Sequence, residues 1–156
     1  MVCSHSAYSI GALQVEPFPV PHDAREPTQF VFVSGSTRLG VLTDVGAGTP
    51  RIVQALAACD ALILEFNHDE AMLQNSSYPP SVRKRIAGQH GHLSNSAAAA
   101  ILSSLDRHKL KRLHAAHLSQ QNNRPELVLE ALATVGTDGI AVELATQADG
   151  FGWMAA

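Results

Sequence analysis

The run ALILEF, residues 61–66, is almost continuously apolar, as expected of a β-strand that is covered on both of its faces. It follows the segment TPRIVQALAACD (49–60), in which apolar residues recur at helical spacing. Thr49 is a suitable N-cap for that helix, and Pro50 stands at the first helical position. A helix that leads directly into an apolar strand indicates an α/β arrangement, in which a sheet and helices pack in layers.

The same alternation of strands and helices extends in both directions from this run. Toward the N-terminus, the pattern predicts strands at ALQVEPF (12–18), TQFVFVSG (28–35) and RLGVLTDVG (38–46). Toward the C-terminus, it predicts two helical pieces within 69–89, a helix at 94–108, a strand within 110–119, a helix at 124–135 and a strand at 140–147. No internal repeat or interdomain linker is visible, so the 156 residues are predicted to form one α/β domain or a part of one.

The composition narrows the class of protein. With 46% hydrophobic and 16% charged residues, the sequence is that of an ordinary globular protein. The formal net charge of −3 provides no basic field for nucleic acid, although a metal centre can itself supply positive charge to a phosphate substrate. Cys3 and Cys59 lack the spacing of paired ligands and are interpreted as reduced thiols of a cytoplasmic protein. We see neither a signal peptide nor an apolar run long enough to span a membrane, so no membrane partner is expected.

Eight histidines are the one unusual feature of the composition, and several of them fall where predicted strands end. His22 follows a predicted strand, Asp44 ends the strand at 38–46, and His117 lies near the end of a third strand. His92 stands just before a predicted helix. Strand ends are rigidly held yet open, and imidazole together with carboxylate suits Zn, Mn or Fe. We call His22, Asp44, His92 and His117 the rim residues.

A purely structural explanation of these residues also remains open. A single histidine near a strand end is more often a surface or hydrogen-bonded structural residue than a ligand. Asp44 could be a turn residue, and Ser94 and Asn95 could be helix caps. Residue types alone therefore favour neither interpretation of the rim residues. Four further histidines lack any partner pattern and are assigned no role: His5, His90, His108 and His114.

Five motifs follow one another along the chain: PHDA (21–24), LTDVG (42–46), LEFNHDEAML (64–73), YPPSVRKRIAGQHGHLSN (78–95) and AAHLSQQNN (115–123). Together they resemble the C-terminal half of a metallo-β-lactamase-fold hydrolase, over roughly residues 12–153. The branch they resemble is that of WalJ (YycJ) type proteins, which are relatives of tRNase Z and of the cyclic phosphodiesterase of phosphonate metabolism. This resemblance implies an α/β fold of the αββα four-layer sandwich type, with two metal ions at one edge between the sheets.

The resemblance also implies roles for the rim residues. His22 matches a histidine that completes the ligand shell of one metal. Asp44 matches the aspartate that bridges both metals. His117 matches the last histidine of the family, which completes the ligand shell of the other metal. His92 matches a histidine that contacts the scissile phosphate or assists the leaving group, so His92 and Asp44 are the expected catalytic residues. Four neighbouring residues match a signature of the branch without an individual role: Glu65, Asn67, His68 and Asp69.

One departure from the family pattern concerns the metal site. The family's main metal motif, His-x-His-x-Asp-His, occurs nowhere in the sequence. It would belong to an N-terminal half preceding residue 1, so residues 1–156 are expected to form only the C-terminal portion of the domain. Only His22, Asp44 and His117 remain as ligands for Zn or Mn. Few ligands imply weak, pH-sensitive binding of the metal.

The expected function is therefore conditional on completion of the site. Completed, the protein is expected to be a metal-dependent, nuclease-like phosphodiester hydrolase, with metal ions that activate water and take up charge on the phosphoryl oxygens. The alternative is a catalytically inactive fragment or an interaction module. The missing half would also leave one apolar face of the sheet uncovered, which favours pairing with the missing half or with a second copy.

Overall fold

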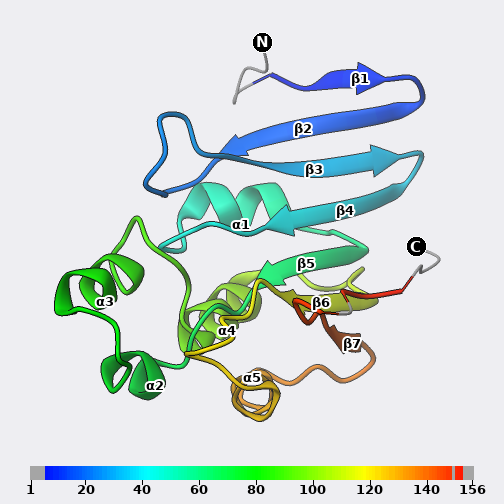
Figure 1. Cartoon of the computed structure of the whole chain (residues 1–156). Helices are drawn as coiled ribbons and strands as arrows, with labels where there is room; N and C mark the ends of the chain where they lie inside the picture. Colours follow the sequence, from blue (N-terminus) through cyan, green and yellow to red (C-terminus); the bar gives the residue numbers. More distant parts are fainter. Residues whose placement is uncertain (1–5, 149, 153–156) are drawn as a thin grey trace.

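The computed structural model describes residues 6–148 and 150–152, which contain one mixed seven-stranded sheet in the order β1-β2-β3-β4-β5-β6-β7 (Figure 1). Strands β1 to β4 pair antiparallel, and β4 to β7 pair parallel. The α/β prediction is thus confirmed, although the short first strand was not predicted. The strands are β1 (Tyr8–Ile10), β2 (Leu13–Pro19), β3 (Thr28–Ser34), β4 (Thr37–Leu42), β5 (Ala61–Glu65), β6 (Arg112–Ala116) and β7 (Ala141–Leu144).

Helices occupy all the predicted helical segments, with somewhat shorter bounds. The Thr49 side chain accepts a hydrogen bond from the backbone N–H of Ile52, which confirms it as the N-cap of the first helix. The helix predicted at 94–108 ends at Ser104, because Leu105 takes up extended backbone angles. The helices are α1 (Pro50–Leu56), α2 (Glu70–Gln74), α3 (Pro80–Ile86), α4 (Asn95–Ser104) and α5 (Pro125–Ala133).

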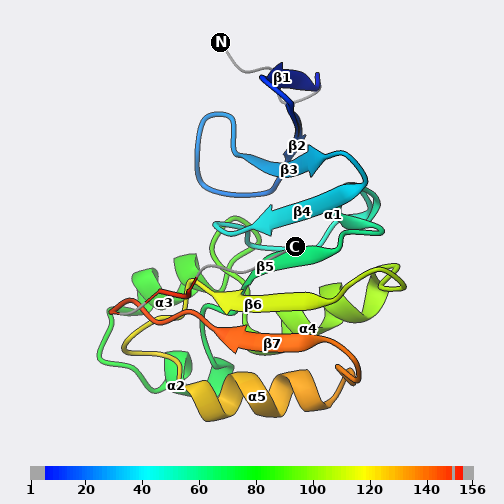
Figure 2. The ribbon, with the colours of Figure 1, turned by 90° about the vertical axis from the view of Figure 1, so that its right-hand side faces the viewer.

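Three of these helices, α1, α4 and α5, cover one face of the sheet (Figures 1 and 2). The core lies between them and the strands. Its fully buried side chains come from alternate positions of the central strands and from the inner faces of the helices, among them Leu42, Leu62, Leu64, Leu113, Ile52, Leu56, Leu102 and Val128. In contrast, α2 and α3 lie beyond the end of β5, at the left of Figure 1.

The opposite face of the sheet is apolar but only half-buried. Cross-strand pairing places Phe30 beside Val41, Phe32 beside Leu39 and Val41 beside Ile63 on this face, and all of these residues are partly exposed. The prediction that 61–66 is covered on both faces is therefore wrong at its centre, because no described helix packs over Ile63. We call these five residues the open face.

Phe151 covers His114 on β6, which is the cross-strand neighbour of Ile63 in the open face. The Phe151 ring lies 4.3 Å from the ring of His114 on β6, between centroids. His114 is consequently buried, and burial lowers the pKa of its imidazole. This contact gives His114 a structural role that its sequence context did not indicate. Among the described residues, no helix is long and apolar enough to cross a membrane.

We expect the isolated chain to self-associate through the open face, because exposed apolar area favours contact with a second copy. Replacing Phe32 and Ile63 together by threonine should weaken self-association at least about tenfold, since it removes apolar area worth about 2–3 kcal/mol. Sedimentation velocity over a concentration series measures the effect.

Leu129→Thr is the matched control, because Leu129 is a half-exposed apolar side chain on α5, on the helical side of the sheet. A wild-type chain that stays monomeric at high concentration contradicts the prediction. So does a Leu129→Thr variant that dissociates as readily as the double variant.

Candidate metal centre

The direction of the strands brings the rim residues to one edge of the sheet. Strands β2 and β4 run the same way because each is antiparallel to β3, and β4, β5 and β6 are parallel. His22 lies three residues beyond the end of β2, Asp44 two beyond β4, and His117 directly after β6. Carboxyl ends of strands that run the same way meet at one edge, where ligands bind in open α/β sheets.

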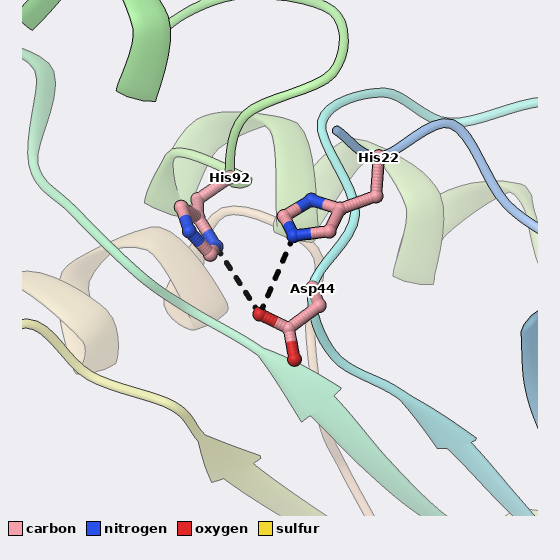
Figure 3. A group of neighbouring side chains, drawn as sticks. All are labelled: His22, Asp44 and His92. Atoms are coloured by element: carbon pink, nitrogen blue, oxygen red, sulfur yellow. Dashed lines mark ion pairs between the residues drawn. The ribbon is translucent and has the colours of Figure 1, made fainter. Parts of the chain in front are cut away.

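At that edge the imidazoles surround a single carboxylate. The Asp44 Oδ1 atom lies 3.8 Å from His22 Nε2, 3.7 Å from His117 Nε2 and 3.9 Å from His92 Nδ1. The His92 ring stands between the other two, with centroid distances of 5.2 Å to His22 and 5.3 Å to His117. Figure 3 shows His22 and His92 reaching toward Asp44 from separate loops. The structure therefore brings all four rim residues together.

His22 is fixed in one tautomer by a backbone carbonyl. Its Nδ1 atom lies 2.9 Å from the carbonyl oxygen of Gly91. Because a carbonyl only accepts, Nδ1 carries the proton and the neutral ring keeps a lone pair at Nε2. That lone pair is on the nitrogen that faces Asp44, as a metal ligand requires.

Two glycines allow close backbone contacts in the loops that carry these residues. A Cβ at Gly91 would lie 2.2 Å from the carbonyl oxygens of Arg85 and Ile86. A Cβ at Gly46 would lie 2.4 Å from backbone atoms of Gln89. No side chain fits at either distance. Glycine at 46 therefore lets the loop after β4 pack against the turn before His92, and glycine at 91 lets that turn close against the end of α3.

The Glu65 carboxylate connects His92 and His117 by hydrogen bonds. Its Oε1 atom accepts hydrogen bonds from Nδ1 of His92 and Nδ1 of His117, both at 2.7 Å, and its Oε2 atom accepts one from the Val45 backbone N–H at 3.0 Å. Burial of the fully inaccessible carboxylate would raise the pKa of Glu65, but the hydrogen bonds from His117 and His92 outweigh it, so the pKa is lowered. The hydrogen bond between His117 and Glu65 also raises the pKa of His117. Carboxylates that orient imidazoles in this way accompany metal ligands.

The backbone is strained at two of the rim residues. Asp44 and His117 have φ angles of 52° and 60°, in the left-handed region that non-glycine residues seldom adopt. Each costs about 1–3 kcal/mol, and such strain clusters at functional sites. The positive φ of Asp44 also explains why β4 ends at Leu42 rather than continuing to residue 46. The Asn67 amide supports His117 by donating to its carbonyl oxygen at 3.0 Å.

The remaining signature residues have structural roles. Asp69 is the N-cap of α2, since its Oδ1 accepts from the Met72 backbone N–H at 2.8 Å. His68 is buried and forms a parallel bridge with Ser94, which joins the exit of β5 to the segment before α4. Ser94 caps α4, as its sequence position suggested. Cys3 and His5 lie outside the described residues, and Cys59 is a buried free thiol.

Three of the rim residues, Asp44, His92 and His117, line a pocket of about 600 Å³. Its first wall contains Asp44, His92, His117 and Asn67, and its second wall comes from Tyr78 and helix α3. The Asp44 side chain is 49% exposed, whereas His22 is 15% exposed, so the carboxylate is the more accessible partner.

The donor set fits a divalent cation. Ligand atoms of His22, Asp44 and His92 lie within 4.8 Å of one another, as do those of Glu65, His92 and His117. Glu65 is fully buried and already accepts two imidazole N–H bonds, so we regard it as an orienting residue. Imidazole nitrogen with carboxylate oxygen suits Zn²⁺ or Mn²⁺. His92 lies as near to Asp44 as the predicted ligands do, so geometry alone does not separate its role from theirs.

Comparisons of the sequence with family models and with curated proteins agree on one family. Residues 3–117 match the family model described as "Beta-lactamase superfamily domain". The chain is 34% identical to the exodeoxyribonuclease YycJ of Bacillus anthracis over 127 residues, which cover 81% of this chain and 48% of that protein. It is 32% identical to the exodeoxyribonuclease WalJ of Streptococcus pneumoniae serotype 2 over 119 residues, which cover 76% of this chain and 44% of that protein. The chain thus spans about half the length of these relatives.

A solved structure supports the fold. The metallo-β-lactamase fold protein YhfI of Bacillus subtilis superposes with a TM-score of 0.70 at 15% identity, covering 98% of this chain and 54% of that one. At such low identity the likeness concerns the fold alone.

We predict that Gly91→Ala lowers the free energy of unfolding by about 1–3 kcal/mol, because the new methyl group overlaps two carbonyl oxygens. The displaced carbonyl of residue 91 also releases His22, so Zn²⁺ affinity should fall. Urea unfolding and calorimetric Zn²⁺ titration measure the two effects. His90→Ala, in the same turn but exposed, is the control; equal behaviour of the two variants contradicts the assignment.

We predict that Glu65→Gln weakens Zn²⁺ or Mn²⁺ binding about 10–100-fold, since a neutral amide orients the two imidazoles poorly. It should also cost about 1–3 kcal/mol of stability, because an amide has only one acceptor oxygen, so either the Val45 N–H or the two imidazole N–H groups lose their acceptor. Glu130→Gln, on the exposed side of α5, is the control for the change in charge. Metal affinity unchanged in Glu65→Gln would rule out the orienting role.

Proposed function

The chain belongs to the beta-lactamase superfamily, and we propose that it provides one half of a metal-dependent phosphodiesterase that acts on nucleic acid. The nuclease assignment is supported by the names of the two relatives that are 34% and 32% identical, both exodeoxyribonucleases. A metal-dependent phosphodiesterase requires a site at which a phosphate can meet a cation and a proton donor.

One observation carries the proposal. The Asp44 carboxylate meets the Nε2 atoms of His22 and His117 at the mouth of a pocket, while the Nδ1 atoms of both rings are held by acceptors. We assign His22, Asp44 and His117 as the residues that would hold Zn²⁺ or Mn²⁺. A cation bound there would supply Lewis acidity and positive charge to the phosphoryl oxygens.

His92 is assigned to the substrate. Its ring lines the pocket, and Glu65 accepts the hydrogen bond from Nδ1, so Nε2 is the nitrogen left for the substrate. Nε2 can donate to a phosphate oxygen or to the leaving oxygen when the ring carries a proton on both nitrogens. Asn67 acts indirectly, by supporting the strained backbone of His117. Each of these residues is held by the fold before any substrate arrives, which is what orientation for attack requires.

We further propose that the site is completed from outside these 156 residues. The His-x-His-x-Asp-His motif is absent from the sequence, and the relatives are about twice as long as the matched region. The open face is where a second sheet of an αββα sandwich would pack, at the usual spacing of about 10 Å between stacked sheets. An inactive fragment or an interaction module is the alternative, and metal content separates the two.

We expect the isolated chain to bind Zn²⁺ or Mn²⁺ weakly and to cleave DNA very slowly, because three ligands place a cation loosely. Fusing it to the N-terminal half of the Bacillus anthracis relative should restore metal content and chelator-sensitive nuclease activity together. In that fusion, Asp44→Ala should abolish both, whereas His92→Ala should slow turnover and leave the metal bound. Matched nuclease assays and metal analysis provide the test.

His108→Ala is the control, because it removes an exposed imidazole that pairs with Asp106 and precedes β6, whereas His117 follows that strand. Robust activity of the isolated chain that survives Asp44→Ala contradicts the assignment of the site. A fusion that folds yet holds no metal supports the inactive alternative.

A further inference from the structure

The second wall of the pocket is a helix that contributes nothing to the core. Helix α3 has no buried residue, and it carries three consecutive cations, Arg83, Lys84 and Arg85. Val82 and Ile86 face the pocket from the same helix, and Val82 is one of the exposed large apolar side chains. Core packing therefore does not account for this surface of the helix.

Only one of the three cations lines the pocket of the rim residues. Arg85 belongs to that pocket, whereas Arg83 and Lys84 line a separate one between α2 and α3. Arg83 is also engaged, since its Nη1 donates to the carbonyl oxygen of Gln74. Lys84 carries the same charge as Arg85 on the adjacent position, which makes it a matched comparison.

Arg85 is held by one edge of its guanidinium group. Its Nε atom donates to Asp23 Oδ2 at 2.7 Å, and Asp23 Oδ1 lies 3.4 Å from His22 Nε2. The hydrogen bond from Arg85 is the main reason that the pKa of Asp23 is lowered. Asp23 thus links Arg85 to the rim residues and fixes the direction of the guanidinium plane.

The other edge of the guanidinium group is free to bind a ligand. Among the described residues, the two terminal nitrogens of Arg85 have no hydrogen-bond partner, and the side chain is 70% exposed. A planar fork of N–H donors matches two oxygens of a phosphate. The chain as a whole is acidic, so a single oriented arginine is a specific source of attraction for an anion at this site.

We propose that Arg85 binds a backbone phosphate next to the one that is cleaved, and that Asp23 orients it for this contact. Tyr78 lies on the same wall and offers an aromatic surface on which the adjoining base can stack, which favours a nucleic-acid strand over a free phosphate ion. This inference rests on the proposed function and adds to it the residue that positions the strand.

The test is binding of a fluorescein-labelled oligothymidylate, followed by anisotropy with EDTA present so that no cleavage occurs. Arg85→Gln should weaken binding about tenfold and reduce the slope of log K against log salt by about 0.7. Lys84→Gln makes the same charge change outside the pocket and should alter affinity less than about twofold. Arg85→Lys, which keeps the charge but loses the fork, should fall between the two.

A second measurement separates the inference from the proposed function. In the completed nuclease, Arg85→Gln should raise KM far more than it lowers kcat, with metal content unchanged. If that protein cleaves DNA but Arg85→Gln and Lys84→Gln behave alike, the role of Arg85 is overturned and the function stands. If no phosphodiester is cleaved yet Arg85→Gln selectively weakens binding, the role of Arg85 stands and the function fails.

Two further outcomes overturn the inference. If the wild-type chain does not bind the oligothymidylate, the inference has no basis. Inorganic phosphate that displaces the probe as effectively as unlabelled oligothymidylate shows a site for the free ion rather than for a strand.

Discussion

A single buried carboxylate, that of Glu65, is the constraint on which the candidate site depends. It stands at the end of β5, a mostly buried strand, and accepts hydrogen bonds from two imidazoles through one oxygen atom. An isolated buried charge costs several kcal/mol, so Glu65 is tolerable only because His92, His117 and the Val45 N–H all donate to it. The requirement to satisfy this carboxylate therefore fixes the orientation of the two rings, and with them the side of each ring that faces the pocket.

The fold supplies the rest of the geometry at the carboxyl edge of the sheet. Three parallel strands and one strand that runs with them end together, so residues far apart in sequence meet without any local motif. The closeness of the loops depends on Gly46 and Gly91, and the positions of Asp44 and His117 depend on strained backbone angles. The core between the sheet and helices α1, α4 and α5 holds these strand ends in place. The stability of that core offsets the backbone strain.

Much of this organisation follows from the sequence. Apolar runs and helical spacing predicted the α/β alternation, and strand-end positions predicted that the rim residues would lie together. The resemblance to metallo-β-lactamase-fold proteins of WalJ (YycJ) type is confirmed by the family match and by the relatives. The metal-binding and catalytic roles of the rim residues stay predictions.

Other features of the site could not be read from the sequence for physical reasons. Glu65 interrupts an otherwise apolar run, which signals a buried charge, but its partners lie 27 and 52 residues away and depend on tertiary structure. The positive φ of Asp44 and the pairing of Arg85 with Asp23 likewise arise from contacts between distant loops. His114 showed no pattern because its partner Phe151 lies far along the chain and contacts it only in the folded structure.

The central claim is that Glu65 orients His117 to hold a divalent cation together with His22 and Asp44, and orients His92 toward the substrate. Anomalous diffraction at the zinc absorption edge, from crystals of the chain equilibrated with Zn²⁺, tests it most directly. The account predicts a peak at bonding distance, about 2.0–2.2 Å, from the Asp44 carboxylate and from Nε2 of His22 or His117, with Glu65 still bonded to both Nδ1 atoms. Zinc bound only at other residues, or bound directly by Glu65 with the imidazoles turned away, would contradict it.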